Sequence, residues 1–271
     1  MPNHSKDFEQ LLNGYFNNFY ADHPADATYV GLSSGEGRLN NVTLPALRRQ
    51  NRRRQSALSN LDTIAPSALS NEQNLDRLAF RTRLLREYED FERGRHTLDP
   101  SGIDAVFEFL LRELQRGETD PKRAANNIRS LLVESQRYLN QAAKLIGRPE
   151  RVWRNIMDDT FKASDSFFDA IATFLKVSGN KKEDSLLIRL AKRACTKYHE
   201  SVMGKRLAKT GSFAIGTATL QRRIHDELGL DYTVGQVEAV AIAEIERVGG
   251  LLEKASEKLE GNKSVDQIVE T

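Results

Sequence analysis

Residues 120–147 read DPKRAANNIRSLLVESQRYLNQAAKLIG, a sequence with the start, the period and the end of a long α-helix. Asp120 before Pro121 is typical of a helix start, and Gly147 of a helix end. The apolar residues between them recur every three or four positions: Ala125, Ile128, Leu132, Leu139, Ala142 and Ile146. Because this spacing lines side chains along one face of a helix, we predict an amphipathic helix that packs through that face.

Helices are also predicted on the N-terminal side of this stretch. Aromatic and leucine residues repeat at helical spacing over residues 8–19, and this helix should end near Pro24. Residues 25–45 contain several glycines among Ser and Asn, so they are predicted to form a long surface loop. A further helix is predicted from about Asn71 to Arg93.

The helix expected over residues 44–61 has a polar middle. Its leucine stripe is interrupted by Asn51 and Arg54, so this part should face something polar. The same helix carries the one dense basic run of the chain: Arg48, Arg49, Arg52, Arg53 and Arg54. Aromatic residues do not alternate with these arginines, which disfavours nucleic-acid binding. We expect a solvated face that pairs with an acidic helix, through residues such as those at 87–92.

The C-terminal half continues the helical pattern. A helix over about Pro149–Val177 should lie antiparallel to the helix that begins at Pro121, because the loop between them is short. Another should start at Asp184, and residues 210–216 should form an interhelical turn. A shorter helix ends at Gly229, and Thr233–Gln236 has the spacing of a capping box ahead of a long helix.

These patterns predict an all-α fold: an array of about seven to nine mostly antiparallel helices with short loops and no significant sheet. We expect residues 1–271 to form a single helical region with a sub-boundary near 209–216.

Composition limits the classes of function. The 40 Lys and Arg residues nearly balance the 38 Asp and Glu residues, so no overall field attracts nucleic acid or a membrane surface. Cys195 is the one cysteine, which rules out an internal disulfide. No apolar run is long enough to span a bilayer, and the start has no leader pattern. We therefore expect a cytoplasmic protein that uses neither nucleic acid nor membrane as a partner.

No catalytic or metal-binding motif in the sequence is complete. A helical zinc hydrolase places two histidines one turn apart, with a glutamate beside the first. After His199-Glu200, the position of the second histidine is occupied by Met203. The segment that starts at His225 also has no second histidine one helical turn later. Cys195 lies on an apolar face and is expected to be buried and inert. We assign no catalytic residue, no metal ligand and no cofactor to this chain.

The end of the sequence repeats a helix-start pattern. Ser264 and Gln267 have capping-box spacing, yet the sequence stops at Thr271. Because a helix of one or two turns is not stable alone, we expect the chain to be part of a longer protein.

Several segments resemble the amino-terminal half of the large bacterial family catalogued as domain of unknown function 885. These are the first helix with HPADATYVG at residues 23–31, GSFAIG at 211–216, Leu220, and LGL at 228–230 before the long final helix. Ser212 departs from the Asp of the family pattern. The resemblance covers nearly the whole chain. It implies a zinc-dependent peptidase-like protein of about twice this length, with its His-Glu metal motif in the carboxy-terminal half.

The resulting hypothesis is that this chain is the scaffold and substrate-cleft half of such a protein, and is inactive alone. Its partners would be the missing C-terminal half and a peptide substrate, and zinc would bind in the full-length protein. Candidates for the cleft lining are Asn51, Arg54, Phe213 and Gly216. The alternative is a helical protein-interaction module with no enzymatic activity.

Overall fold

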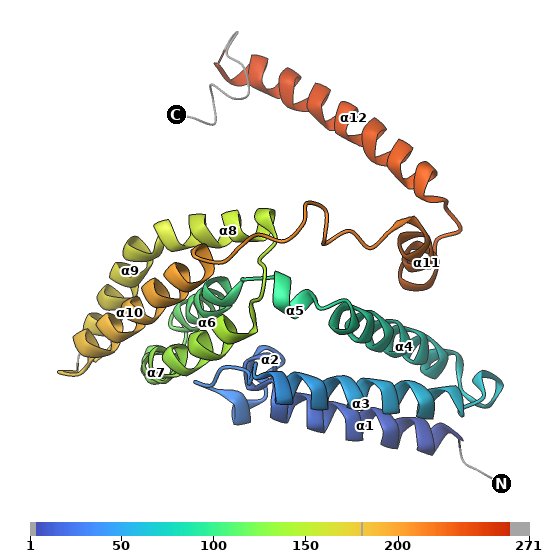
Figure 1. Cartoon of the computed structure of the whole chain (residues 1–271), viewed down its shortest axis with the longest axis horizontal. Helices are drawn as coiled ribbons and strands as arrows, with labels where there is room; N and C mark the ends of the chain where they lie inside the picture. The colour runs from blue at the N-terminus through green and yellow to red at the C-terminus, as the bar shows by residue number, and fades with distance from the viewer. Residues whose placement is uncertain (1–3, 180, 261–271) are drawn as a thin grey trace. The chain divides into compact units, whose positions relative to one another are not determined.

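A computed structural model describes residues 4–179 and 181–260 of the chain (Figure 1). Their helices are α1 (His4–Asp22), α2 (Pro24–Tyr29), α3 (Leu44–Asp62), α4 (Asn71–Glu92), α5 (Arg95–Leu98), α6 (Gly102–Arg116), α7 (Pro121–Leu145), α8 (Arg151–Lys162), α9 (Ser164–Val177), α10 (Asp184–Met203), α11 (Thr217–Leu228) and α12 (Val234–Glu260), with 3-10 turns at Ser33–Gly35 and Pro66–Ala68. These residues contain no strand, which confirms the all-α class. More helices are present than expected, and two of them, α2 and α5, are only six and four residues long.

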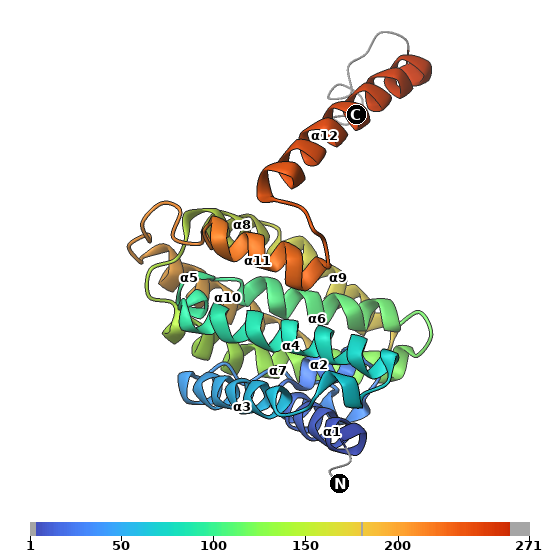
Figure 2. The same ribbon diagram turned by 90° about the vertical axis from the view of Figure 1, so that its right-hand side faces the viewer.

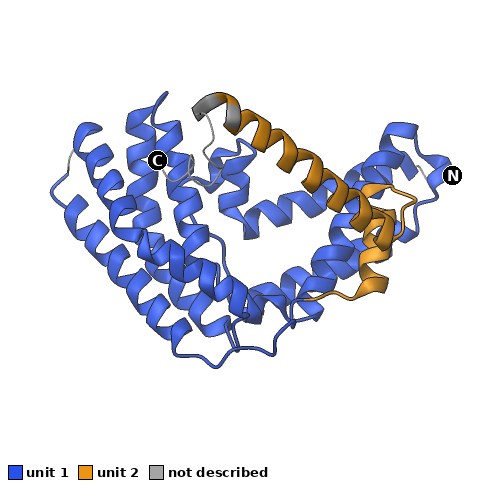
Figure 3. Cartoon of the chain, turned by 90° about the horizontal axis from the view of Figure 1, so that it is seen from above, with its two compact units in different colours: residues 1–213 blue, residues 214–271 orange. Residues whose placement is uncertain are grey.

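The chain divides into two compact units, Met1–Phe213 and Ala214–Thr271 (Figure 3). No described helix combines the length and the apolar character needed to cross a bilayer.

Helix α7 is central to the larger unit. The Asp120 side chain accepts a hydrogen bond from the main-chain N of Arg123 at 3.1 Å, so it caps the helix as its position predicts. The predicted apolar face is buried: Ile128 and Leu132 are fully inaccessible to solvent. α7 packs against α6 and α10, and α8 and α9 complete this first core. The sequence-based interpretation of residues 120–147 is therefore correct.

A second core joins the N-terminal helices of the same unit. Phe8 of α1, Leu61 of α3, and Phe80 and Leu84 of α4 are buried together. α3 and α4 lie side by side, as both Figure 1 and Figure 2 show. The helices predicted here end within a residue or two of the observed bounds. Other leucines of α4 are not covered, since Leu75 is 70% exposed and Leu78 is 49% exposed.

Residues 25–45 are only in part the surface loop that their composition predicted: residues 29–34 are exposed and residues 36–43 are not helical, but other parts of the segment are helical or buried. Pro24 starts α2, and Ala25, Ala27 and Leu39 are buried. At Gly35 a Cβ atom would lie 1.9 Å from the main-chain O of Pro24, so this glycine is needed for close packing of two backbone segments. The glycines in this region therefore reflect tight packing as well as turns.

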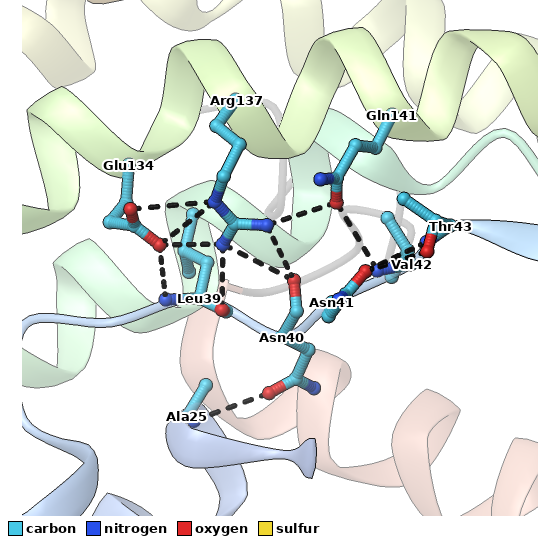
Figure 4. A network of polar contacts seen from close by, with 9 residues as sticks. All are labelled: Ala25, Leu39, Asn40, Asn41, Val42, Thr43, Glu134, Arg137 and Gln141. Atoms are coloured by element: carbon cyan, nitrogen blue, oxygen red, sulfur yellow. Dashed lines mark hydrogen bonds and ion pairs between the residues drawn. The ribbon is translucent and has the colours of Figure 1, made fainter. Parts of the chain in front are cut away.

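Arg137 of α7 holds the end of this segment (Figure 4). Its guanidinium donates to the main-chain O of Leu39 at 2.8 Å and to the side-chain O of Gln141 at 2.9 Å. It also pairs with Glu134, whose carboxylate accepts a hydrogen bond from the main-chain N of Leu39. One arginine thus supplies donors to main-chain groups that would otherwise lack partners.

The single helix predicted over residues 149–177 is two helices, α8 and α9, separated by a turn at Ala163. The main neighbours of α8 are α6 and α10, so the prediction that it packs beside α7 was wrong. The turn allows Met157 of α8 and Phe168 of α9 to enter the same core. No Gly or Pro marks the turn in the sequence, which explains why periodicity did not reveal it.

The smaller unit contains α11 and α12. α11 ends at Gly229, which has a φ of 62°, a conformation that favours glycine. The predicted capping box is present: the N of Gln236 donates to the Thr233 hydroxyl at 3.2 Å, and the N of Thr233 donates to the Gln236 side chain at 2.8 Å. The second capping pattern, at Ser264 and Gln267, lies outside the described residues.

Candidate functional site

The polar middle of α3 faces α4. Asn51 is buried, and its Nδ2 donates to Oε1 of Glu92 at 2.7 Å. Arg54 Nε lies 2.8 Å from Oε2 of Glu87. The expected pairing with residues 87–92 is therefore present. Two other arginines of the same run, Arg49 and Arg53, pair with an acidic residue of α1, Asp22.

The structure does not bring the four predicted cleft residues into one site. Phe213 ends the larger unit, is 49% exposed, and has its ring centroid 6.0 Å from that of Trp153. Gly216 belongs to the smaller unit and precedes α11 with a φ of 79°. Arg54 lines a pocket of the larger unit, whereas Asn51 does not. That any of the four contacts a substrate stays a prediction.

A pocket of about 330 Å³ lies where the two cores of the larger unit meet, and we call it the central pocket. Its walls come from α3, α4, α5, α7 and α10. The lining residues are Val42, Leu47, Arg54, Glu87, Asp90, Phe91, Arg95, His96, Asp99, Ser101, Gly102, Tyr138, Ala142, Leu145, Ile146 and Tyr198. Its volume is at the lower end of the range of small-molecule sites, and it combines apolar walls with a few polar groups, as such sites do.

The Arg54–Glu87 pair forms one wall of the central pocket. A second guanidinium, that of Arg83, lies 2.9 Å from Oε1 of Glu87. Burial raises the pKa of Glu87, but Arg54 and Arg83 outweigh this effect, so its pKa falls below the usual value. Burial also raises the pKa of the adjacent Tyr15 to about 12. Glu87 therefore stays ionised and serves as an acceptor, whereas the Tyr15 phenol stays protonated.

His96, in the short helix α5, also lines the central pocket. Its ring stacks on Phe91 with centroids 4.6 Å apart, and its Nδ1 is buried without a hydrogen-bond partner among the described residues. Burial lowers the pKa of His96, and the positive charge of Arg48 lowers it further. The ring is therefore neutral near pH 7 and keeps one unused hydrogen-bonding atom.

Two tyrosines complete the polar lining. Burial raises the pKa of Tyr138 to about 12. Burial also raises the pKa of Tyr198, whose hydroxyl donates to the main-chain O of Pro100 at 2.9 Å. Both phenols stay protonated near neutral pH. The pocket thus offers neutral hydrogen-bonding groups beside two sets of paired charges, Arg54 with Glu87 and Arg95 with Asp90 and Asp99. This arrangement is suited to a polar ligand without a large net charge.

Sequence reasoning did not identify the histidine and the tyrosines of this pocket. His96 and Tyr138 belong to no motif, and their juxtaposition depends on how α5 packs against α7. Glu87 was named only as a partner of the arginine run. The polar interruption at Arg54 was the one sequence signal that indicated this region.

The remaining candidate groups are engaged elsewhere. His199 Nε2 lies 2.7 Å from Oδ1 of Asp158, and its ring stacks on Phe161. His225 is beside Asp226. Burial raises the pKa of Cys195 to about 12, so its thiol is not a nucleophile at neutral pH. Within the part of the chain that the structure describes, no three His, Cys, Asp or Glu side chains are grouped as metal ligands would be.

Fold and pocket together define an all-helical protein with a ligand-sized pocket between two helical cores. The sequence profile of the family described as "Bacterial protein of unknown function (DUF885)" matches residues 24–271, and the chain therefore belongs to this family.

A solved structure supports the same fold. It is described as "a putative lipoprotein of unknown function" from Shewanella oneidensis, and it superimposes with a TM-score of 0.67 at 16% identity. The similarity covers 93% of this chain but 48% of the other, so the chain spans about half the length of that protein. At this identity the likeness concerns the fold alone. A comparison with curated proteins gives no match.

Proposed function

We propose that this chain is the scaffold and substrate-cleft half of a zinc-dependent peptidase-like protein, with the catalytic motif outside the chain, and that the central pocket binds part of a peptide. The observation that carries the proposal is the pocket itself: a small-molecule-sized hollow with an unpaired, neutral His96 and a compensated Arg54–Glu87 pair. The likeness to a protein about twice as long gives it support.

The chemistry of the lining suits a peptide. A peptide bond carries one donor and one acceptor and no net charge, so it needs both kinds of partner without an excess charge. Nδ1 of His96 and the hydroxyl of Tyr138 supply such partners. Leu47 and Phe91 supply apolar wall for a side chain. The pocket would therefore hold a short uncharged segment rather than a free ion.

The described residues offer no zinc site, because no three His, Cys, Asp or Glu side chains are grouped among them. When bound in the complete protein, zinc would activate water for hydrolysis. We assign no step of that reaction to a residue of this chain. The contribution proposed for this chain is to bind and orient the substrate.

A blocked dipeptide, N-acetyl-Ala-Ala-amide, tests peptide binding. Saturation-transfer NMR with the 271-residue chain should show contact with the protein, and His96→Phe should weaken it. A matched control is His225→Gln, which changes an exposed histidine in the smaller unit and should leave the signal unchanged. Absence of contact, or equal contact in the His96 variant, would overturn the assignment of the pocket.

A zinc titration with a peptide-hydrolysis assay tests the division of roles. We expect neither stoichiometric tight zinc binding nor hydrolysis by the chain alone. Tight zinc at one site per chain would contradict the proposal that the metal site lies elsewhere.

One observation favours the alternative, a helical interaction module. α12 exposes a series of large apolar side chains: Val240, Ile242, Ile245, Leu251 and Leu252. Such a surface is typical of a helix that is covered by another protein segment. Under the leading proposal its partner is the remainder of the longer protein, whereas an interaction module would use a separate protein. Failure to bind the dipeptide, with concentration-dependent self-association that Ile245→Glu removes, would favour the module.

A further inference from the structure

A second hollow, of about 720 Å³, lies between α7 and α10, and we call it the basic groove. The two helices pack against each other along this edge (Figure 1). Positions 136, 139, 140, 143 and 144 of α7 face it at helical spacing, as do Leu190, Arg193, Ala194, Lys197 and Ser201 of α10. Tyr198 and Lys205 complete the lining.

The lining carries four cationic side chains and no carboxylate: Lys144, Arg193, Lys197 and Lys205. Lys205 donates to the main-chain O atoms of Ala143 and Ile146 at the end of α7, where the helix dipole favours a cation, and it pairs with no carboxylate in these contacts. The other three make no ion pair with any residue that the structure describes, although most arginines of this chain are paired.

The surroundings of the groove do not supply the missing negative charge. The adjoining hollow beside α3 shares Asn140 and Lys144 with the groove, and its lining also lacks Asp and Glu. Glu200 belongs to α10 but does not line the groove. Four like charges around one hollow repel each other, so an anion that enters it relieves this repulsion.

We infer that the basic groove binds a small organic anion with two or more negative charges, such as a phosphate ester or a polycarboxylate. The volume is that of a metabolite or cofactor site. The floor is apolar, with Leu139, Leu190 and the ring of Tyr198, and can contact a carbon skeleton. Asn140 and Ser201 offer neutral hydrogen bonds at the rim. This inference does not depend on the function proposed for the central pocket.

Isothermal titration calorimetry of the 271-residue chain with four probes tests the inference. The probes are ADP, pyrophosphate, citrate and uncharged adenosine. At least one of the three anions should bind, adenosine should not, and affinity should fall as salt rises. ADP or pyrophosphate without citrate would identify a phosphate site, and citrate alone a carboxylate site.

The double variant Arg193→Gln/Lys197→Gln should lower the affinity for the anion by about tenfold or more. The reason is that a hydrogen bond from a charged group contributes more than one from a neutral group. Lys122→Gln/Arg151→Gln removes the same charge from exposed positions outside the groove and should have little effect. Circular dichroism checks that both variants are folded. The inference is overturned if no anion binds, if adenosine binds as well as ADP, or if the two double variants behave alike.

Discussion

Arg129 of α7 and Asp184 at the start of α10 form a buried, two-point ion pair. Nε of Arg129 lies 2.7 Å from Oδ1 of Asp184, and Nη2 lies 3.0 Å from Oδ2. The side chains are 10% and 6% exposed. The same guanidinium donates to the main-chain O of Gly179 at 2.8 Å. One cation therefore connects α7 to the segment that leads into α10.

Asp184→Asn should destabilise the protein, because it leaves the guanidinium of Arg129 buried without its counter-charge. The expected loss in the free energy of unfolding is about 3 kcal/mol, measured by urea denaturation. Asp159→Asn is the control: it breaks a pair with Lys162 at a carboxylate that is 75% exposed, and should cost less than about 1 kcal/mol. Similar losses in both variants would show that the buried pair has no special role.

The same pair predicts an acid-dependent loss of stability. Hydrogen bonding to Arg129 holds the pKa of Asp184 below its ordinary value of 3.8. Because the pKa is lower in the folded state, the ionised carboxylate adds stability at pH values above 3.8. This added stability disappears as the pH falls through the folded-state pKa. The stability gap between the natural chain and Asp184→Asn should therefore be widest near neutral pH and shrink below pH 3.8. A gap that stays constant through this range would contradict the assignment.

Arg137→Lys should loosen residues 38–43 without unfolding the protein. Lysine cannot reach the main-chain O atoms of Leu39 and Asn40 and the side chain of Gln141 together, as the guanidinium does. We expect faster amide hydrogen exchange in this segment and a loss of roughly 1–2 kcal/mol. Arg151→Lys, at an exposed position, should change neither. Unchanged exchange at 38–43 would mean that packing alone orders the segment.

Gly35→Ala should destabilise the protein through a steric clash. The added Cβ would meet main-chain atoms of Pro24, which cannot move aside as a flexible side chain can. A loss of about 2–3 kcal/mol is expected from thermal or urea unfolding. Gly14→Ala is the matched control, because nothing lies within 4 Å of its added Cβ and alanine favours the helix. The two variants should change stability in opposite directions.

His96 should make stability depend on pH near neutrality. Burial and Arg48 lower its pKa below 6.5, so protonation is easier in the unfolded state. Its contribution is complete above pH 6.5 and declines as pH falls through the folded-state pKa. In His96→Gln, stability should fall less steeply as the pH falls. Some decline should remain because burial also lowers the pKa of His23. Proton NMR of the His96 ring measures the pKa directly, and a value at or above 6.5 would refute this account.

Helices with strong local signals could be predicted from the sequence. Asp120, Pro121 and the apolar period after them identified α7, and Thr233 with Gln236 identified the start of α12. The turn at Ala163 could not be predicted, since it arises because Met157 and Phe168 pack into one core and not from any local signal. α6 was not identified, although Ile103, Val106 and Leu110 are buried at helical spacing. The prediction for residues 25–45 was correct only in part, because glycine marks both turns and close packing.

The candidate site was less accessible to sequence reasoning than the fold. Arg54 stood out because it interrupts a leucine stripe, a local irregularity that periodicity reveals. His96 and Tyr138 are more than 40 residues apart and meet only through tertiary packing. The basic groove shows the same limit, because Lys144 and Arg193 look like ordinary surface charges until α7 and α10 are placed together.

Tyr198 belongs to the linings of both the central pocket and the basic groove. Its ring is 2% exposed, its hydroxyl is bound to Pro100, and a Cβ at Gly102 would lie 2.8 Å from its Cζ. The ring is thus part of the wall of both hollows and has little room to move. Because no other residue that the structure describes lines both hollows, a change in the size of this one side chain affects both volumes. An engineered enlargement of either hollow at this residue would need to be assayed at both.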